Sequence, residues 1–146
     1  MSTVDLLPLA CTHEVRDGCL CLHVQRVARA LTRGFDEAFR PLGLTSGQFS
    51  LLVSLNRPEA PKLGEVARLL AMDRTTLTAA LKPLQRRKLV RSRVDADDRR
   101  SRNLALTPAG KRLVAEAFPI WKREHARLEK QLTDSNRLRA DLRMLA

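Results

Sequence analysis

Apolar side chains recur every three or four residues within residues 20–39, and this spacing predicts an amphipathic helix. Pro41 and Gly43 follow and end this helix. Residues 45–48 have the Thr-x-x-Gln pattern of a capping box, so a second helix is expected to begin there and to stop near residue 56. The chain is therefore expected to begin with one long helix and one short helix.

Two shorter amphipathic segments follow, and the break between them is only a few residues long. The first covers residues 63–70, and the second runs from Asp73, a residue type that favours the N-cap, to Leu89. Two short helices joined by such a turn are typical of a helix-turn-helix. Pro83 lies inside the second segment and is expected to bend it, because proline removes a backbone hydrogen bond.

After these helices the pattern changes to that of a hairpin. Residues 89–94 and 103–106 predict two strands, and the turn between them mixes acidic residues with arginines. A Thr-Pro pair at residues 107–108 predicts the start of a long helix, which Pro119 is expected to kink. Residues 135–145 predict a last helix. The expected fold class is mainly α, a winged helix-turn-helix with a small β-hairpin as its wing.

The charge of the chain indicates a polyanionic partner. Lys and Arg number 27 against 16 Asp and Glu, which gives a formal net charge of +11. One Trp, four Phe and no Tyr are too few aromatic residues for the stacking platforms that bind single-stranded nucleic acid. Double-stranded DNA is therefore the favoured partner, and a basic protein that binds nucleic acid without sequence preference is the alternative.

The second helix of the predicted helix-turn-helix carries most of the expected DNA contacts. No Asp or Glu occurs between Arg74 and Val94, whereas a merely solvated surface would mix both signs. Small and hydroxylated side chains let a helix approach base edges, and long cations reach phosphates. The residues of this helix expected to contact DNA are Arg74, Thr75, Thr76, Thr78, Lys82 and Arg86.

The turn of the hairpin supplies the remaining expected DNA contacts. Arg100 is expected to enter the minor groove, where negative potential is concentrated. Asp98 is expected to hold the guanidinium of Arg100 by a charge-assisted hydrogen bond and so to set its direction. Arg99 and Arg102 are expected to contact phosphates.

The two helical ends of the chain, residues 19–40 and 109–146, carry apolar stripes that the middle of the chain is too small to cover. Two interpretations remain open: the ends of two chains interlock in a homodimer, or they cover the core of their own chain. The homodimer is favoured, because it also pairs two DNA-binding lobes. Residues 1–146 then form one domain, in which residues 45–107 are the DNA-binding lobe.

Several short motifs stand out along the chain. They are Leu-Gly-Leu-Thr at 42–45, Leu-Gly-Glu-Val-Ala at 63–67, Leu-Lys-Pro-Leu at 81–84, Arg-Lys-Leu-Val at 87–90, and Asp98-x-Arg100 with Leu-Thr-Pro-Ala-Gly at 106–110. Together they resemble the MarR family, the multiple-antibiotic-resistance regulators, over about residues 20–145. The resemblance implies a triangular homodimer that binds a pseudo-palindromic operator, usually as a repressor, with Arg100 in the minor groove. It also implies a cleft for small aromatic ligands, which Arg26, Phe35, Phe118 and Trp121 would line.

All three cysteines lie near the amino terminus, and they allow three interpretations. They are buried or incidental thiols in the first. In the second they sense redox state: the helix that begins here resembles that of the organic-hydroperoxide-sensing branch of the MarR family, with Cys21 as the reactive thiol and Cys19 or Cys11 as the resolving one. In the third they bind a metal together with His13 and His23, although the spacings match no standard zinc finger.

Other classes of protein are disfavoured. The sequence has no Gly-rich phosphate loop, nucleophile elbow or His-Glu-x-x-His pair, so neither an enzyme nor a cofactor or metal is expected. No apolar run reaches the roughly 18 residues of a membrane-spanning helix, and the amino terminus lacks the features of a signal peptide. The sequence predicts a cytoplasmic transcriptional regulator that a small aromatic ligand or a peroxide releases from DNA.

Overall fold

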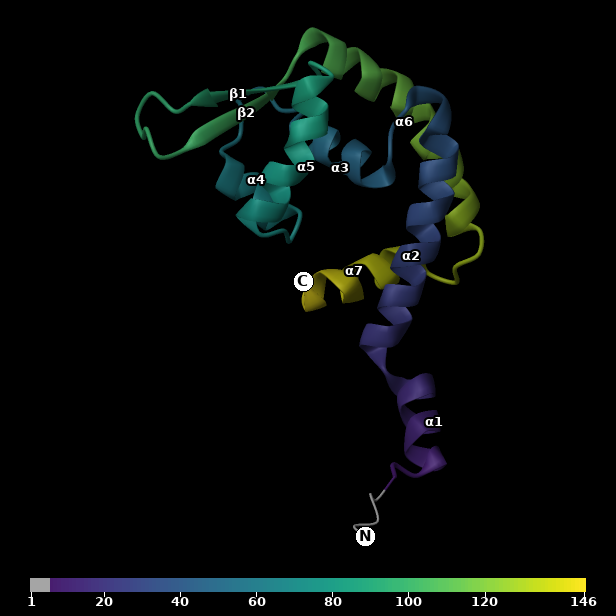
Figure 1. Ribbon diagram of the computed structural model, residues 1–146. Coiled ribbons are helices and arrows are strands. Elements are labelled where there is room, and N and C mark those ends of the chain that lie inside the picture. The colour runs from purple at the N-terminus through teal and green to yellow at the C-terminus, as the bar shows by residue number, and fades with distance from the viewer. Residues whose placement is uncertain (1–5) are drawn as a thin grey trace.

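The computed structural model describes residues 6–146 as a series of helices with one β-hairpin (Figure 1). The segment considered for a signal peptide lies partly outside these residues. The mainly α fold class with a two-stranded hairpin is confirmed. In chain order the elements are α1 (Leu9–Gly18), α2 (Leu20–Phe39), the 3-10 helix η1 (Arg40–Leu42), α3 (Ser46–Ser54), α4 (Leu63–Leu69), α5 (Arg74–Arg86), β1 (Val90–Val94), β2 (Arg102–Leu106), α6 (Pro108–Glu129) and α7 (Ser135–Leu145).

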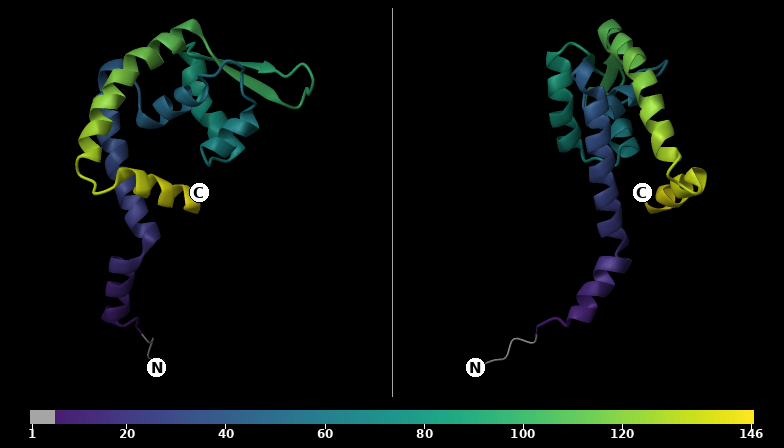
Figure 2. Two further views of the ribbon diagram at one scale, coloured as in Figure 1. Left: turned by 180° about the vertical axis from the view of Figure 1, so that it is seen from behind. Right: turned by 90° about the vertical axis from the view of Figure 1, so that its right-hand side faces the viewer.

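One side of the molecule is formed by α2 and α6, which lie side by side (Figures 1 and 2). Helix α1 leads away from them, and the break between α1 and α2 is Cys19, whose backbone is extended. The hydrophobic pattern does not predict α1, because this helix buries no residue and has no continuous apolar stripe. Among the helices of residues 6–146, none combines the length and the apolar character needed to cross a bilayer.

The other side is a compact lobe of α3, α4, α5 and the hairpin, which we call the hairpin lobe, residues 44–106 (Figure 1). Its core is made of buried aliphatic and phenylalanine side chains. The end of α2 and the middle of α6 complete this core through Phe39 and Ala117. The largest fully buried side chains are Phe39, Leu51, Leu52, Leu77, Leu84, Leu104 and Val66.

The predicted side-chain caps are present at the start of three helices. Thr45 and Gln48 form a capping box at α3. Asp73 caps α5 and Thr107 caps α6, each by accepting a hydrogen bond from a backbone amide three residues further on. Because the first turn of a helix leaves its amides without partners in the helix, these caps determine where each helix begins.

Helix α5 ends at Arg86, three residues before the predicted end at Leu89. Lys88 has a left-handed backbone with φ of 57°, and the amide of Leu89 donates to the carbonyl of Leu84. This arrangement is a Schellman motif, which ends a helix by turning the chain back over its last carbonyls. The same motif ends α4 and places Ala71 at φ of 52°, so it makes the turn of the helix-turn-helix. Both residues carry a Cβ in a conformation that favours glycine.

The hairpin is attached to the start of the helix-turn-helix. Its strands pair antiparallel, with Val90 opposite Leu106 and Val94 opposite Arg102, so β2 begins one residue earlier than predicted. In the middle of β2, the amide of Leu104 donates to the carbonyl of Pro61 at 2.9 Å. The loop before α4 therefore pairs with the edge of β2 and fixes the hairpin to the lobe.

The Leu-Thr-Pro-Ala-Gly motif packs the start of α6 closely against the end of α5. A Cβ on Gly110 would lie 2.2 Å from the carbonyl oxygen of Leu89, so only glycine permits this approach. The hydroxyl of Thr107 donates to the carbonyl of Lys88 at 2.6 Å. From there α6 runs on through Pro119 and bends along its length (Figure 1).

Candidate nucleic-acid interface

Helix α5 has one side in the core of the hairpin lobe and the other side in solvent. Leu77, Leu81 and Leu84 are buried and fix the rotation of the helix about its axis. Their spacing turns the polar side chains outward. The exposed residues include all six that the sequence predicts to contact DNA on this helix: Arg74, Thr75, Thr76, Thr78, Lys82 and Arg86.

The three threonines of α5 differ in their hydrogen bonds. The amide and the hydroxyl of Thr76 donate to the carboxylate of Asp73 at 2.7 and 2.8 Å, and the hydroxyl of Thr78 donates to the carbonyl of Arg74 at 2.8 Å. The two bonds from Thr76, the amide first, hold the pKa of Asp73 below its ordinary value. Among residues 6–146 the hydroxyl of Thr75 has no such partner, so it keeps its capacity to bond a base edge.

Arg74 begins α5, and its side chain reaches back over α4. Its Nη2 atom lies 2.9 Å from the position that a Cβ on Gly64 would take. The guanidinium therefore occupies space that a larger residue on α4 would fill. The atom in question is the far end of a flexible side chain, so a larger residue at position 64 would displace this guanidinium and leave the packing of α4 intact.

Within residues 6–146, the cations from α5 to the end of the hairpin have no acidic partners. Seven lie between Arg74 and Arg93, and within the described range 6–146 none of them forms an ion pair. The wing arginines at 99, 100 and 102 are likewise without an ion pair there. Because the chain does not neutralise these cations, they leave a surface of positive potential that suits phosphate groups.

One of these cations, Arg87, has a structural role. Its Nη1 donates to the carbonyl of Gly43 at 2.8 Å and its Nη2 to the carbonyl of Leu42 at 3.4 Å. Arg87 thereby connects the end of α5 to the turn after α2. Sequence reasoning does not reveal this role, because the paired residues lie 44 positions apart in the chain.

The prediction that Asp98 orients the guanidinium of Arg100 is wrong. Asp98 accepts a hydrogen bond from the backbone amide of Arg100 at 3.0 Å and another from the hydroxyl of Ser101 at 3.0 Å. No ion pair joins Asp98 to Arg100 in the part of the chain that the structure describes. A short aspartate in a turn reaches amides two residues further on, which compete with a distant guanidinium. Asp98 therefore shapes the turn, and Arg100 is exposed at its tip.

Asp95 lies directly after β1 and is buried, with 8% of its surface exposed. The sequence pattern alone does not mark it as a functional residue. Its Oδ1 accepts hydrogen bonds from the amides of Asp97 and Asp98, at 2.8 and 3.3 Å, and its Oδ2 lies 3.8 Å from the Nζ of Lys62. The bond from the Asp97 amide is the main cause that holds the pKa of Asp95 below its ordinary value, against the effect of burial. A sequence signal exists, because an aspartate followed by turn residues is typical of an Asx turn.

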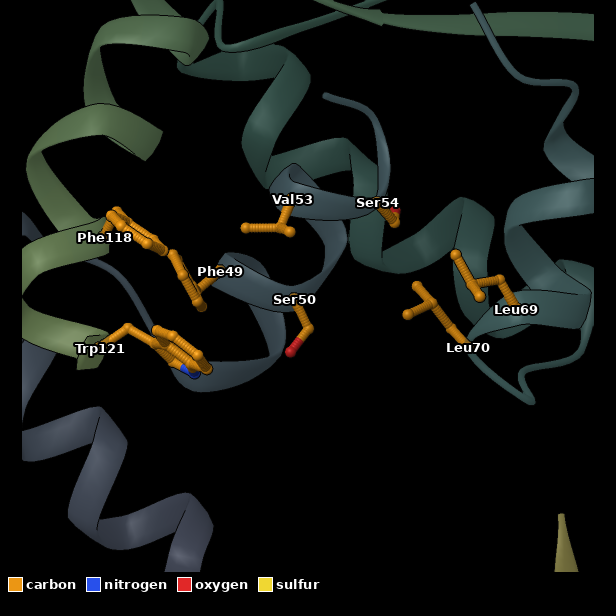
Figure 3. A pocket seen from close by; sticks show the side chains of 8 residues that line it. All are labelled: Phe49, Ser50, Val53, Ser54, Leu69, Leu70, Phe118 and Trp121. Carbon is orange, nitrogen blue, oxygen red and sulfur yellow. The ribbon is translucent and has the colours of Figure 1, made fainter. Parts of the chain in front are cut away.

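The four side chains predicted to line a ligand cleft do not lie together. Phe118 and Trp121 stack with ring centroids 5.7 Å apart and line an apolar pocket of about 350 Å³ against α3 and α4 (Figure 3). Phe35 instead faces a groove between α2, α6 and α7, and Arg26 lies along the exposed side of α2. The residues that line the pocket are Phe49, Ser50, Val53, Ser54, Leu69, Leu70, Phe118 and Trp121.

The cysteines lie along α1 and at its junction with α2. Cys19 caps α2, with its Sγ 3.4 Å from the amide nitrogen of Leu22, and Cys21 is exposed and accepts a hydrogen bond from Gln25 at 3.2 Å. Helix α1 separates Cys11 from the other two cysteines by a rise of about 12 Å, which exceeds the roughly 7 Å between Cα atoms that a disulfide can span. Cys11 therefore cannot act as a resolving thiol within the same chain in this conformation. In the described residues, no three His, Cys, Asp or Glu side chains gather as metal ligands, which gives the metal interpretation no support.

The apolar stripes of the helical ends are largely exposed. Helix α2 buries only Phe39, and α7 buries no residue. Helix α7 is attached to α6 by a hydrogen bond from Arg139 to Glu129 at 2.6 Å, and an apolar groove of about 340 Å³ lies between α2, α6 and α7. Covering the chain's own core accounts for little of this apolar surface. The exposed large apolar residues are Leu20, Val24, Val27 and Leu31 on α2 and Leu138, Leu142, Met144 and Leu145 on α7.

Several known proteins resemble this chain in sequence and architecture. A sequence model of the MarR family matches residues 44–101. The transcriptional regulator MosR of M. tuberculosis, solved in complex with DNA, is 35% identical, with a TM-score of 0.81 over 87% of this chain and 92% of that chain. The transcriptional repressor CouR, solved with a 23-mer DNA duplex, is 31% identical, with a TM-score of 0.75 over 90% and 92% of the two chains.

A curated relative gives a consistent result. It is an uncharacterized helix-turn-helix transcriptional regulator, YybA, of Bacillus subtilis, and it is 29% identical over 98 residues, which are 67% of this chain. The matched segment spans 63% of the length of that relative. These proteins are transcriptional regulators and not enzymes.

Proposed function

Because this chain belongs to the MarR family of DNA-binding transcriptional regulators, we propose that it is a repressor that binds a pseudo-palindromic operator as a homodimer. The observation that carries this proposal is the exposed side of α5, whose cations have no acidic partner among residues 6–146 and which lies on the same lobe as the arginine-rich wing. A helix of this kind fits the major groove of a DNA duplex, while the wing reaches the flanking minor groove. The DNA complexes of MosR and CouR support this arrangement.

On α5 the proposed contacts divide by position. Thr75 and Arg74 lie at the amino-terminal end of the helix, the end that contacts base edges in helix-turn-helix proteins. Lys82 and Arg86 lie two and three turns later, where a helix in the major groove approaches the backbone, so they are assigned to phosphates. Thr76 and Thr78 contribute through the cap and the backbone bond described above, and they place the helix rather than select the sequence.

In the wing, Arg100 is assigned to the minor groove and Arg99 and Arg102 to phosphates. All three are exposed, and Arg100 lies in the turn at the tip of the hairpin. A narrow minor groove concentrates negative potential and attracts an inserted guanidinium. The wing is therefore expected to add affinity at A·T-rich flanks of the operator.

The proposed homodimer uses the exposed apolar faces of α2 and α7 as its interface. Contiguous apolar surface of this extent marks an interaction site in most proteins. A twofold interface there pairs two hairpin lobes, and their α5 helices must lie about 34 Å apart to enter successive major grooves. A pseudo-palindromic operator follows from this symmetry.

Release by a small molecule is proposed at the pocket between α3, α4 and α6 (Figure 3). A ligand there would contact both the hairpin lobe and α6, and it would release DNA by favouring a lobe spacing that no longer matches the grooves. The apolar lining and the stacked rings of Phe118 and Trp121 fit a planar aromatic group. CouR of Rhodococcus jostii RHA1, solved with p-coumaroyl-CoA, supports regulation by an aromatic compound.

Oxidation is the second proposed route of release, and the exposure of Cys21 favours it. A thiol that solvent reaches can react with a peroxide and change the junction between α1 and α2, where Cys19 caps the helix. Treatment with peroxide should then weaken operator binding by the wild type and leave Cys21→Ser unaffected. A wild type that binds equally before and after peroxide removes this route.

An electrophoretic shift assay tests the proposed function. The protein is titrated into the DNA upstream of its own reading frame and into a scrambled duplex of the same composition, at physiological salt. A sequence-specific repressor should prefer the first by about 10³-fold or more. Equal binding to both, with a steep loss of affinity as salt rises, would instead identify the non-specific basic protein.

A further inference from the structure

The wing contains one buried acid, Asp95, and within residues 6–146 the one cation that pairs with it is Lys62, at 3.8 Å. Asp97 and Asp98 are exposed, but Asp95 is buried at the point where β1 ends and the turn begins. An aspartate beside a DNA-binding surface repels phosphate, and burying a carboxylate disfavours its charged form. The contacts that Asp95 makes must therefore stabilise the wing by more than the repulsion of phosphate and the burial of the carboxylate cost.

On the side of the turn, the contacts of Asp95 restrain residues 97, 98 and 101. Its Oδ1 accepts the amides of Asp97 and Asp98 at 2.8 and 3.3 Å, and its own amide donates to the carbonyl of Ser101 at 2.9 Å. Asp98 then accepts the amide of Arg100 at 3.0 Å and the hydroxyl of Ser101 at 3.0 Å. A continuous set of hydrogen bonds thus runs from Asp95 to the backbone of Arg100.

On the opposite side, Asp95 contacts the start of the helix-turn-helix. Its Oδ2 lies 3.8 Å from the Nζ of Lys62, the residue before the first turn of α4. Lys62 also pairs with Asn103 of β2 in an isolated β-bridge, near the turn end of the hairpin. The same carboxylate therefore connects the turn of the wing to the lobe that holds α5.

We propose that Asp95 is the positioning residue of the wing: it holds the turn in the conformation that presents Arg100 to DNA and fixes that turn to α4. Asp95 touches no DNA in this arrangement and acts only through the backbone. This inference rests on the proposed function, because it requires that Arg100 contacts DNA.

Three variants test it, with operator affinity measured by fluorescence anisotropy. Asp95→Ala removes the carboxylate, Asp95→Asn keeps an oxygen that accepts the two amides, and Asp97→Ala is the matched control. Asp97 lies in the same turn and carries the same charge, but among residues 6–146 its side chain forms no ion pair. Circular dichroism and a thermal melt of each variant verify that the lobe is folded.

The direction of the change separates positioning from simple electrostatics. Loss of a negative charge near DNA should strengthen binding, and we expect Asp97→Ala to bind as tightly as the wild type or slightly more tightly. Asp95→Ala loses the same charge, and we expect it to bind about tenfold more weakly, the worth of one good side-chain contact to DNA. Asp95→Asn should recover most of that loss. An Asp95→Ala protein that binds as tightly as Asp97→Ala would overturn the proposal.

A double-mutant cycle with Arg100→Ala completes the test. If Asp95 acts through Arg100, adding Asp95→Ala to Arg100→Ala should cause no further loss, whereas two independent effects would multiply. Full multiplication refutes the positioning role. If Arg100→Ala alone binds like the wild type, the failure lies with the proposed DNA contact and not with Asp95.

Discussion

The hairpin lobe and the helices at the two ends of the chain use apolar residues in opposite ways. In the lobe, the leucines of α3 and α5 are buried together with Leu104 of the hairpin. On α2 and α7, apolar side chains at the same helical spacing lie in solvent, with Val27 56% exposed and Leu145 69% exposed. The pattern in the sequence is alike in both regions, so what differs is whether the chain itself supplies the opposing surface.

The hairpin lobe is complete within one chain, whereas the helical ends are not. The hairpin lobe has a closed core, capped helices and a hairpin fixed to the lobe through β2. The helical ends have stripes with little to pack against, although α7 is attached to α6 by Arg139. A second copy of the chain is the proposed source of the missing surface, and four variants test this contrast.

The largest effect is expected from truncation in the core of the lobe. Leu84→Ala should lower the free energy of unfolding by about 2–5 kcal/mol, because Leu84 is fully buried and the cavity cannot collapse completely. Urea denaturation at several protein concentrations measures it. The loss of unfolding free energy in Leu84→Ala should not depend on protein concentration. The smaller loss in Leu142→Ala on α7 should depend on protein concentration, because Leu142 lies on the proposed dimer interface. Equal, concentration-independent losses in both variants would contradict the comparison.

Next in size is a charge placed in the proposed interface. Leu138→Asp on α7 should dissociate the homodimer and weaken operator binding by about 100-fold or more, because the second lobe no longer binds as part of the same molecule. Analytical ultracentrifugation and anisotropy measure the two effects. Asn136→Asp adds the same charge beside it on an exposed position and is the control. A dimer that survives Leu138→Asp would remove this face from the interface.

A smaller effect is expected from the tip of the wing. Arg100→Ala should weaken operator binding by about tenfold without changing the melting temperature, because Arg100 is exposed and makes no ion pair within residues 6–146. Arg123→Ala, an exposed arginine on α6, removes the same charge away from the wing and should have little effect. If both variants lose affinity equally, the wing acts only through net charge.

The smallest effect concerns the turn of the helix-turn-helix. Ala71→Gly should stabilise the protein by about 0.5–1 kcal/mol, because the left-handed backbone at φ of 52° strains any residue with a Cβ. Ala79→Gly in the middle of α5 should destabilise it by about 1 kcal/mol. Thermal denaturation of the two variants should therefore give shifts of opposite sign, and shifts of the same sign would show that the strain at Ala71 is negligible.

Much of the fold and of the candidate interface is predictable from local pattern. The bounds of α2 and α7, the caps at Thr45, Asp73 and Thr107, and the exposure of the polar side of α5 all follow from spacing and residue type. These features depend on residues within one or two turns of each other. Helix α1 escapes prediction for the same reason, because it has no buried side to leave a pattern.

Residue type and spacing along the chain predict the α-helices from α2 onward, the two strands and the positively charged side of α5, since these features depend on neighbours close in the chain. Three features come from the folded arrangement and not from local pattern: Asp98 bonds an amide, Arg87 supports the turn after α2, and Phe118 and Trp121 share a pocket without Phe35 or Arg26. When a side chain has several possible hydrogen-bond partners, the distance and the direction to each partner determine which bond forms. Arg87 bonds carbonyls that lie 44 and 45 positions earlier in the chain, and Asp98 has the amide and the guanidinium of the same residue, Arg100, as alternative partners. Spacing along the chain does not settle either choice.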